Sequence, residues 1–450
     1  MKLTIAQSAL AELIETAKKG VATRPVDPIL NALLIEASNQ GKLTVIGTDL
    51  GISIKTTAVA NIHKEGIVAL NARLLADTVT NLPSGELEIE VNERTCTISH
   101  STGECRIVGG YPEDFPSIPE SKEPIEISIP SKKLESALQA SIYCSSTDET
   151  KFILTGVHFQ INSENYTCAS TDGHRLAFVS SKLDKNDELE LIKFTVPRRS
   201  LIELETILSR TTENSSCTIK IGNNTIQFIL PNAEITSRLL EGEYPCIQNI
   251  IPRSFANELI VERKGIEAIL KRISHFADKK NKIVKILWEV DKQAATLMSG
   301  ESDIGDAVDS IAINKVLAGA SNDIAIGLNS GYLLEALKHI PTDEVVFRFN
   351  NCLQPVILSP VGGLIDQLAL VMPIEIAHMR FNKPEAKTDD SESTDELVIN
   401  DTGKSEVEPN QVSETNDTEE TPLTDKPTNK SKSRKRKQDI PKAELETTSA

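Results

Sequence analysis

The chain has 450 residues and a mass of 49.2 kDa, and 39% of its residues are hydrophobic. This length allows roughly two to four ordinary domains, and the hydrophobic content excludes disorder of the whole chain. The formal net charge of −17 argues against a surface that is basic throughout, as domains that grip nucleic acid tightly usually are. A local basic lining remains compatible with this charge.

The sequence has no pattern typical of a membrane span. Its first residues, MKLTIAQSALAELIE, lack a basic stretch followed by an unbroken apolar core, and no later apolar run approaches the roughly 20 residues of a membrane helix. We therefore expect a cytoplasmic protein without membrane contact. The seven cysteines are scattered and never spaced as CxxC, which favours reduced core residues over a disulfide framework or a zinc site.

Six segments carry apolar residues at helical spacing, and they recur along the chain. They begin at Ala6, Asn71, Ser131, Pro197, Arg263 and Asn329. Equivalent starts lie 125 to 132 residues apart, so the first 381 residues divide into three units of about 127 residues. Solenoid repeats are shorter, roughly 20 to 50 residues, so three similar domains in a row fit better.

Runs of strand type separate these helical segments. Two of them, LTVIGTDLGISIKTTAV and YTCASTDGHRLAFVSSKL, carry the pairs Thr48-Asp49 and Thr171-Asp172 at the same point, and Glu301 lies near this point of the third unit. Paired runs such as ELEIEV and CTISHS follow the second helix of a unit, with Asn or Gly at the turn. The sequence therefore predicts an α+β fold of three repeated domains, each with a strand-helix-strand-strand plan stated twice.

Pro-containing connections at 116–130 and 245–258 separate the units. We expect domains at 1–120, 126–250 and 257–381, followed by a disordered tail at 382–450. The tail has no aromatic residue and only 11 hydrophobic residues among 69, too few to offset the entropy of ordering it. Its basic cluster, Lys432 and Arg434 to Lys437, fits a nucleic-acid contact or, the favoured interpretation, a solvated charge run in a tether.

A row of similar domains with two helices each suits a ring. If two chains join through unlike ends and the rotation closes, the assembly is finite, with helices as its lining and sheets outside. A basic residue on one helix usually belongs to its solvated face, but here positive charge recurs on all six helices. The residues are Lys18, Lys19, Arg73, Lys132, Lys133, Arg198, Arg199, Lys264, Lys271, Arg272 and Lys338.

Several phrases resemble those of the bacterial sliding clamps, the beta subunits of the DNA polymerase III holoenzyme, over residues 1–381. The most specific is STDGHRLA, from Ser170 to Ala177. Further matches are GVATRPVDPIL around Arg24, GTDL at 47–50, the YP and IIP phrases within 244–252, and LVMPI at 370–374.

This resemblance implies clamp-type domains with two helices each lining a ring and antiparallel sheets outside. It implies a head-to-tail homodimer that encircles duplex DNA, is loaded by an ATP-driven clamp loader, and confers processivity on the replicative polymerase. It implies no catalytic residue, no cofactor and no metal. A ring stays on DNA by topology and needs few phosphate contacts, so the acidic composition agrees with this role.

The resemblance also implies two sets of site residues. The DNA contacts are Arg24, Arg73, Arg198 and Arg199. Short apolar peptides of the polymerase III catalytic subunit, the clamp loader, other polymerases and repair proteins would bind a groove between the second and third domains, formed by Leu154, Thr171, Gly173, His174, Arg175, Leu176, Pro245, Ile250, Asn329, Tyr332, Val371, Met372 and Pro373. Leu154, Leu176 and Val371 also fit plain core residues.

Two other classes of function stay open. An enzyme could be built around Asp172 and His174, although no GxSxG, HExxH or GxxxxGK[ST] motif accompanies them, and His174 fits a hydrogen-bonded structural residue better than a base. An assembly scaffold without DNA, whose tail recruits partners, is the other alternative.

Overall fold

The computed structural model describes residues 1–119, 121–183, 190–277, 282–300, 305–319 and 323–376. Glu301 and the expected tail at 382–450 lie outside the described residues. We use the names domain 1, domain 2 and domain 3 for the expected ranges 1–120, 126–250 and 257–381. No helix in the described ranges is both long enough and apolar enough to cross a membrane.

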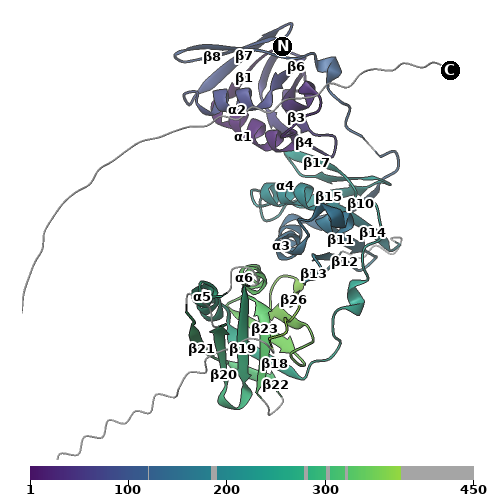
Figure 1. The fold of residues 1–450 in the computed structure, drawn as a ribbon. Coiled ribbons are helices and arrows are strands. Elements are labelled where there is room, and N and C mark those ends of the chain that lie inside the picture. Colours follow the sequence, from purple (N-terminus) through teal and green to yellow (C-terminus); the bar gives the residue numbers. More distant parts are fainter. Residues whose placement is uncertain (120, 184–189, 278–281, 301–304, 320–322, 377–450) are drawn as a thin grey trace, which may run out of the picture. The chain divides into compact units, whose positions relative to one another are not determined.

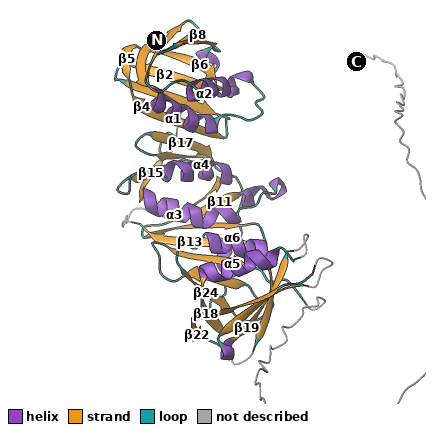
Figure 2. Cartoon of the chain, turned by 90° about the vertical axis from the view of Figure 1, so that its left-hand side faces the viewer, coloured by secondary structure: helices purple, strands orange, loops and turns teal. Residues whose placement is uncertain are grey.

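Each segment with helical spacing forms an α-helix, as predicted (Figure 1). The helices are α1 (Gln7–Ala17), α2 (Ala72–Thr80), α3 (Ser131–Ser141), α4 (Arg198–Leu208), α5 (Arg263–Ser274) and α6 (Ser330–Lys338). Asn71 and Asn329 cap α2 and α6, since their side-chain oxygens accept hydrogen bonds from backbone N–H groups of the first turn. The two helices of each domain pack side by side (Figure 2).

Strands make up the rest of each domain. Domain 1 holds β1 (Lys2–Ala6), β2 (Ala32–Ser38), β3 (Lys42–Thr48), β4 (Ile52–Val59), β5 (Asn61–Lys64), β6 (Gly66–Asn71), β7 (Glu86–Asn92), β8 (Thr95–His100) and β9 (Gly103–Val108). Domain 2 holds β10 (Ile125–Pro130), β11 (Gly156–Ile161), β12 (Asn165–Thr171), β13 (Arg175–Lys182), β14 (Ile192–Pro197), β15 (Ser216–Ile221), β16 (Thr225–Ile229) and β17 (Ala233–Arg238). Domain 3 holds β18 (Asn257–Glu262), β19 (Ile283–Glu289), β20 (Ala294–Ser299), β21 (Val308–Ala312), β22 (Lys315–Ala318), β23 (Ile324–Asn329), β24 (Glu344–Phe349), β25 (Val356–Pro360) and β26 (Asp366–Val371).

The repeated plan has one strand more per half than the sequence suggested. Apart from the short strands β5 and β22, each half of a domain runs strand, helix and then three strands, as in β1-α1-β2-β3-β4 and β10-α3-β11-β12-β13. The additional strand is the one that carries the sheet into the neighbouring domain: β4 pairs with β17, and β13 pairs with β26. The strand pairs are antiparallel, which agrees with the predicted α+β class.

Two sheets therefore continue from one domain into the next. The eight-stranded sheet has the order β10-β15-β16-β17-β4-β3-β2-β6, and the nine-stranded sheet has the order β14-β11-β12-β13-β26-β25-β24-β18-β22. We call the β4–β17 pair the first joint and the β13–β26 pair the second joint. The remaining sheets, β5-β1-β7-β8-β9 of domain 1 and β21-β20-β19-β23 of domain 3, stay within their own domains.

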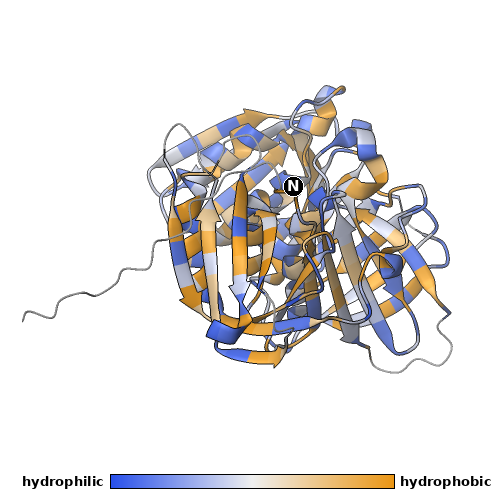
Figure 3. Cartoon of the chain, turned by 60° about the horizontal axis from the view of Figure 1, so that its bottom comes forward, coloured by the Kyte–Doolittle hydropathy of each residue, from blue (hydrophilic) through white to orange (hydrophobic). Residues whose placement is uncertain are grey.

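One large apolar cluster fills each domain. The strands alternate apolar and polar residues, so one face of each sheet packs on this core (Figure 3). Ile52 and Ile54 of β4 belong to the cluster of domain 2, because β4 extends the sheet of that domain. The prediction of core cysteines is wrong for Cys246 and Cys352, which are exposed in connections outside the strands.

Charged side chains reinforce the first joint. Arg199 of α4 pairs with Asp49 and also donates to the carbonyl oxygens of Lys19 (3.3 Å) and Val21 (3.4 Å). Lys19 in turn pairs with Glu203 of α4 at 3.0 Å. These contacts tie the second helix of domain 2 to domain 1.

We predict that Arg199→Ala destabilises the chain by about 1 kcal/mol, because the largely buried Asp49 carboxylate loses its ion pair with the guanidinium. Arg73→Ala is the matched control, because the Arg73 side chain is 89% exposed and its ion-pair partner among the described residues is Asp77 of its own helix, at 3.7 Å. Urea denaturation should show a lower midpoint for Arg199→Ala alone. Equal midpoints for the two variants would contradict the role given to Arg199.

Candidate functional site

The turn at 171–175, between β12 and β13, is built around its Thr-Asp pair. Thr171 Oγ1 accepts from the Gly173 N–H (3.1 Å) and donates to the Arg175 carbonyl (2.6 Å). Asp172 Oδ1 accepts from the backbone N–H groups of His174 (2.9 Å) and Arg175 (3.1 Å). Gly173 has a φ of +96°, a conformation that favours glycine. The turn is thus held by its own side chains before any partner binds.

Domain 1 repeats this turn with different residues. Thr48 Oγ1 accepts from the Leu50 N–H (3.2 Å) and donates to the Ile52 carbonyl (3.1 Å), and Asp49 Oδ1 accepts from the N–H groups of Gly51 (2.9 Å) and Ile52 (2.8 Å). The recurring Thr-Asp pair of the sequence is therefore a turn motif in both domains. Its position directly before β4 and β13 places it beside each joint.

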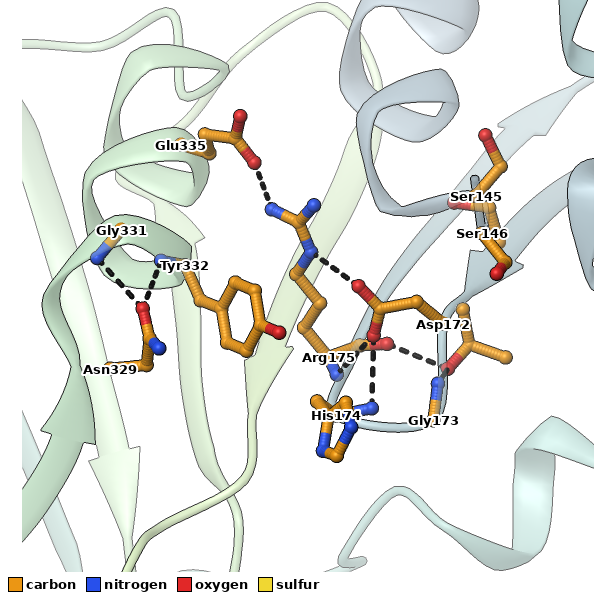
Figure 4. Close-up of polar contacts among 12 residues, drawn as sticks. Ser145, Ser146, Asp172, Gly173, His174, Arg175, Asn329, Gly331, Tyr332 and Glu335 are labelled. Atoms are coloured by element: carbon orange, nitrogen blue, oxygen red, sulfur yellow. Dashed lines mark hydrogen bonds and ion pairs between the residues drawn. The ribbon is translucent and has the colours of Figure 1, made fainter. Parts of the chain in front are cut away.

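Arg175 lies at the centre of the second joint (Figure 4). Its Nε donates to Asp172 Oδ2 at 2.9 Å, and its Nη1 pairs with Glu335 of α6 in domain 3. Its guanidinium carbon lies 4.7 Å from the ring centroid of Tyr332, also in α6. Burial alone would lower the pKa of Arg175, but hydrogen bonds with Glu335 and Asp172 outweigh burial and raise the pKa above its usual value. This residue remains charged.

An apolar cluster lies next to this turn, where β13 meets β26. It contains Leu176 and Leu370 from the two strands, with Leu154 packed against it and Tyr244 and Ile247 from the connection between domains 2 and 3. The Tyr244 hydroxyl accepts a hydrogen bond from the Thr171 N–H at 3.1 Å. The connection is thereby fixed to the turn.

Several of the predicted groove residues lie at the second joint. Val371 is paired with Arg175 across the sheet, and the Met372 N–H donates to the His174 carbonyl at 3.0 Å. Leu176 is only 1% exposed and is a core residue, whereas Ile250 and Met372 are 39% and 37% exposed. The exposed members, which also include Gly173, His174 and Pro245, are the ones that a partner could contact directly.

Three contributors to this site were absent from the sequence-based set: Tyr143, Tyr244 and Glu335. Tyr143 stacks on His339 of domain 3 with ring centroids 4.3 Å apart. Tyr244 stood in the YP phrase beside Pro245, so the motif pointed to it. Glu335 had a weaker signal, its equivalence to Glu203 in the repeat of the second helix.

Asp172 and His174 do not form a catalytic dyad. The hydrogen bond between them runs from the His174 backbone N–H to Asp172 Oδ1, and the His174 ring faces Tyr332 with centroids 6.2 Å apart. The second oxygen of Asp172 is engaged by Arg175. In the described ranges, no group of His, Cys, Asp and Glu side chains is arranged to hold a metal ion.

The four residues predicted to contact DNA differ in their surroundings. Arg24 is exposed in the loop after α1, and Arg73 is almost fully exposed in α2. Arg198 donates to the Ser145 carbonyl at 3.2 Å, and Arg199 is engaged at the first joint. Arg24 and Arg73 are therefore the most accessible of the four.

Most of the other helix cations have carboxylate neighbours. The pairs are Lys18 with Glu15, Lys132 with Glu135, Lys264 with Asp343, Lys271 with Glu267, and Arg272 with Asp309. These partners reduce the net positive charge of the helices.

A cavity of about 1010 Å³ lies behind Tyr244, on the face of β11, β12 and β14 that points away from the core. His158 lines it, stacks on Tyr244 with centroids 4.8 Å apart, and shares a hydrogen bond of 3.1 Å with the Thr195 hydroxyl. Burial, and secondarily the charge of Lys193, lower the pKa of His158 to about 4.

We predict a pH-dependent loss of stability from His158. The fold favours its neutral form, whereas the unfolded chain binds a proton below about pH 6.5, so stability present above pH 6.5 is lost as the pH falls towards 4. His158→Phe keeps a ring against Tyr244 and should lose less stability than the unchanged chain as the pH falls from 6.5 to 4.5. The difference should be below roughly 1.4 kcal/mol for each pH unit, because solvent screens the partly exposed ring. His63→Phe, at an exposed site of β5, is the control. Identical pH profiles in urea denaturation for all three proteins would contradict this role.

Comparisons with known proteins agree with this architecture. Family models of the DNA polymerase III beta subunit match residues 1–119 (N-terminal domain), 128–246 (central domain) and 248–374 (C-terminal domain). The chain is 31% identical to the beta sliding clamp of Synechocystis and 30% identical to that of Bacillus subtilis, covering 100% and 99% of those proteins with 84% and 82% of its own length.

Solved structures give the same result. The crystal structure of the Bacillus subtilis sliding clamp matches with a TM-score of 0.77 at 28% identity, over 83% of this chain and 99% of that one. A Pseudomonas aeruginosa sliding clamp bound to griselimycin matches with a TM-score of 0.78 over 83% and 99%, and at 21% identity it supports the fold alone. With three consecutive domain matches and relatives covered over their whole length, the chain belongs to the DNA polymerase III beta subunit family of sliding clamps.

Proposed function

We propose that the chain is a sliding clamp in which two copies close head to tail into a ring around duplex DNA and tether the replicative DNA polymerase. The tether keeps the polymerase at the primer end through many additions and so confers processivity on chromosomal replication. The clamp itself performs no catalysis and needs no cofactor. It works in the cytoplasm.

The proposal rests on the fact that both joints pair equivalent strands of the repeat. In each, the last strand of the first half of one domain pairs with the last strand of the second half of the next domain, β4 with β17 and β13 with β26. The same pairing, applied once more, joins β21 of domain 3 with β9 of domain 1 in a second copy. Among the described strands, β9 and β21 each lie at the end of a sheet. Two such pairings close a dimer through unlike ends.

The charge pattern supports encirclement over tight binding. A closed ring is held by topology and must slide, so a strongly attractive lining would slow it. Arg24 and Arg73 supply accessible positive charge, and Arg198 and Arg199 lie at the start of α4. These contacts would go to phosphates and carry no sequence information.

The second joint supports a separate role as partner site. The exposed side chains of Ile250 and Met372 lie among the groove positions around a preformed turn, and short apolar anchors bind such surfaces with little reorganisation. We assign the clamp loader, the polymerase III catalytic subunit, other polymerases and repair proteins to this site.

Retention on circular DNA tests the function. The protein, loaded onto a nicked circular plasmid by a bacterial clamp loader, should elute with the DNA in gel filtration and dissociate once a restriction enzyme linearises the plasmid. Replacing both Arg24 and Arg73 with Ala should weaken retention on the circle, because two phosphate contacts are lost. Arg94→Ala is the matched control, since Arg94 lies over Tyr111 (4.4 Å) in domain 1, outside the helices.

Retention that survives linearisation would show ordinary DNA binding without encirclement. Failure to remain on the circle under loading conditions would favour a scaffold that does not act on DNA. Either result would overturn the proposed function.

A further inference from the structure

The second helix of domains 2 and 3 carries a glutamate at the same repeat position. Glu203 of α4 follows the cap residue Pro197 by six residues, and Glu335 of α6 follows its cap Asn329 by six. Each reaches a cation of the preceding domain: Glu203 pairs with Lys19 at 3.0 Å, and Glu335 pairs with Arg175. Both joints therefore contain an ion pair between a carboxylate of the second helix and a cation of the preceding domain.

The two cations differ in what else they touch. Lys19 lies in the middle of the short turn Lys18–Gly20 that follows α1, and it contacts α4 at the first joint. Arg175 ends the turn at 171–175, and its backbone N–H and its Nε both bind Asp172. Glu335 thus holds a side chain that is itself part of the candidate groove (Figure 4).

A second contact between domains 2 and 3 lies close to the Glu335–Arg175 pair. His339, one helical turn further along, stacks on Tyr143 of domain 2 with an interplanar angle of 2°. Gln367 of β26 donates to the His339 carbonyl at 3.0 Å, which ties the end of α6 to the strand of the second joint. The position of Glu335 relative to Arg175 therefore depends on the docking of domain 3 against domain 2.

We propose that Glu335 is a positioning residue of the partner groove: from domain 3 it fixes the Arg175 guanidinium of domain 2, so that the groove rim is assembled only while the second joint is closed. This inference rests on the proposed function, because it takes the groove to bind partner peptides. The Arg175 side chain is 12% exposed and that of Glu335 48%, so the carboxylate is accessible from solvent while its partner is enclosed. Without Glu335, Arg175 keeps Asp172 but gains rotamer freedom that a bound peptide must remove again.

The test compares two equivalent carboxylates. A fluorescein-labelled synthetic peptide of the clamp-binding segment of a bacterial polymerase III catalytic subunit is titrated with the full chain, and fluorescence anisotropy gives the affinity. We expect Glu335→Gln to weaken binding about three- to tenfold, in line with the loss of one charged hydrogen bond and of preorganisation. Glu203→Gln breaks the matching ion pair at the first joint and should leave peptide affinity unchanged. Met372→Ser, at an exposed groove position, should weaken binding and so serves as the positive control.

A double substitution separates positioning from a general loss of structure. Arg175 binds Asp172 through Nε and Glu335 through Nη1, and the single ammonium group of Lys lacks these two separate donors. In an Arg175→Lys background, Glu335→Gln should therefore change the peptide affinity less than it does in the unchanged chain. Equal affinity of Glu335→Gln and the unchanged chain, an equal loss in Glu203→Gln, or full additivity with Arg175→Lys would each overturn the assignment of Glu335. Absence of peptide binding by the unchanged chain would instead overturn the groove itself, and this inference with it.

Discussion

The antiparallel pairs β4–β17 and β13–β26 join consecutive domains through backbone hydrogen bonds, and the other features of the chain are arranged around them. Because a sheet edge left open offers unpaired N–H and C=O groups, each domain satisfies its edge with the edge of the next. The apolar cores follow the sheets across the boundary, so that Ile52 and Ile54 of domain 1 are buried in the cluster of domain 2. The three domains are thereby joined by two continuous sheets, one across each joint.

The two joints are built on the same kind of turn. The turns at 48–52 and 171–175 lie at the joint strands, and each presents an aspartate to an arginine. Asp49 pairs with Arg199 in the second helix of domain 2, whereas Asp172 pairs with Arg175, which also pairs with Glu335 in the second helix of domain 3. At the first joint these contacts hold domains 1 and 2 together. At the second joint the same turn has Gly173 in place of Leu50 and contacts Met372 and Tyr244, and we propose that it forms part of a partner site.

Much of the fold could be predicted from the sequence because the same pattern of helical and strand-type segments occurs three times. The six helices and the three α+β domains follow from the spacing of the repeat. The STDGHRLA phrase, through its resemblance to the sliding clamps, predicts a partner site at the segment from Thr171 to Leu176. The additional strand per half could not be predicted, since ISIKTTAV reads as a continuation of the preceding run until its pairing with β17 is known. Nor does a sequence distinguish Leu176 in the core from exposed Met372, or show that Arg199 is engaged by Asp49, because those facts depend on contacts between domains.

The most direct test of this account is hydrogen–deuterium exchange of the strands β9 and β21 as a function of protein concentration. Where the chain is dimeric, alternate amides of both strands should become protected together, because each strand gains a neighbour from the other copy, while β5 at the opposite edge of its sheet keeps its exchange rate. Mass measured in parallel should approach twice the chain mass of 49.2 kDa. Rapid exchange in β9 and β21 at every concentration, or protection of one without the other, would contradict closure of the ring through these edges.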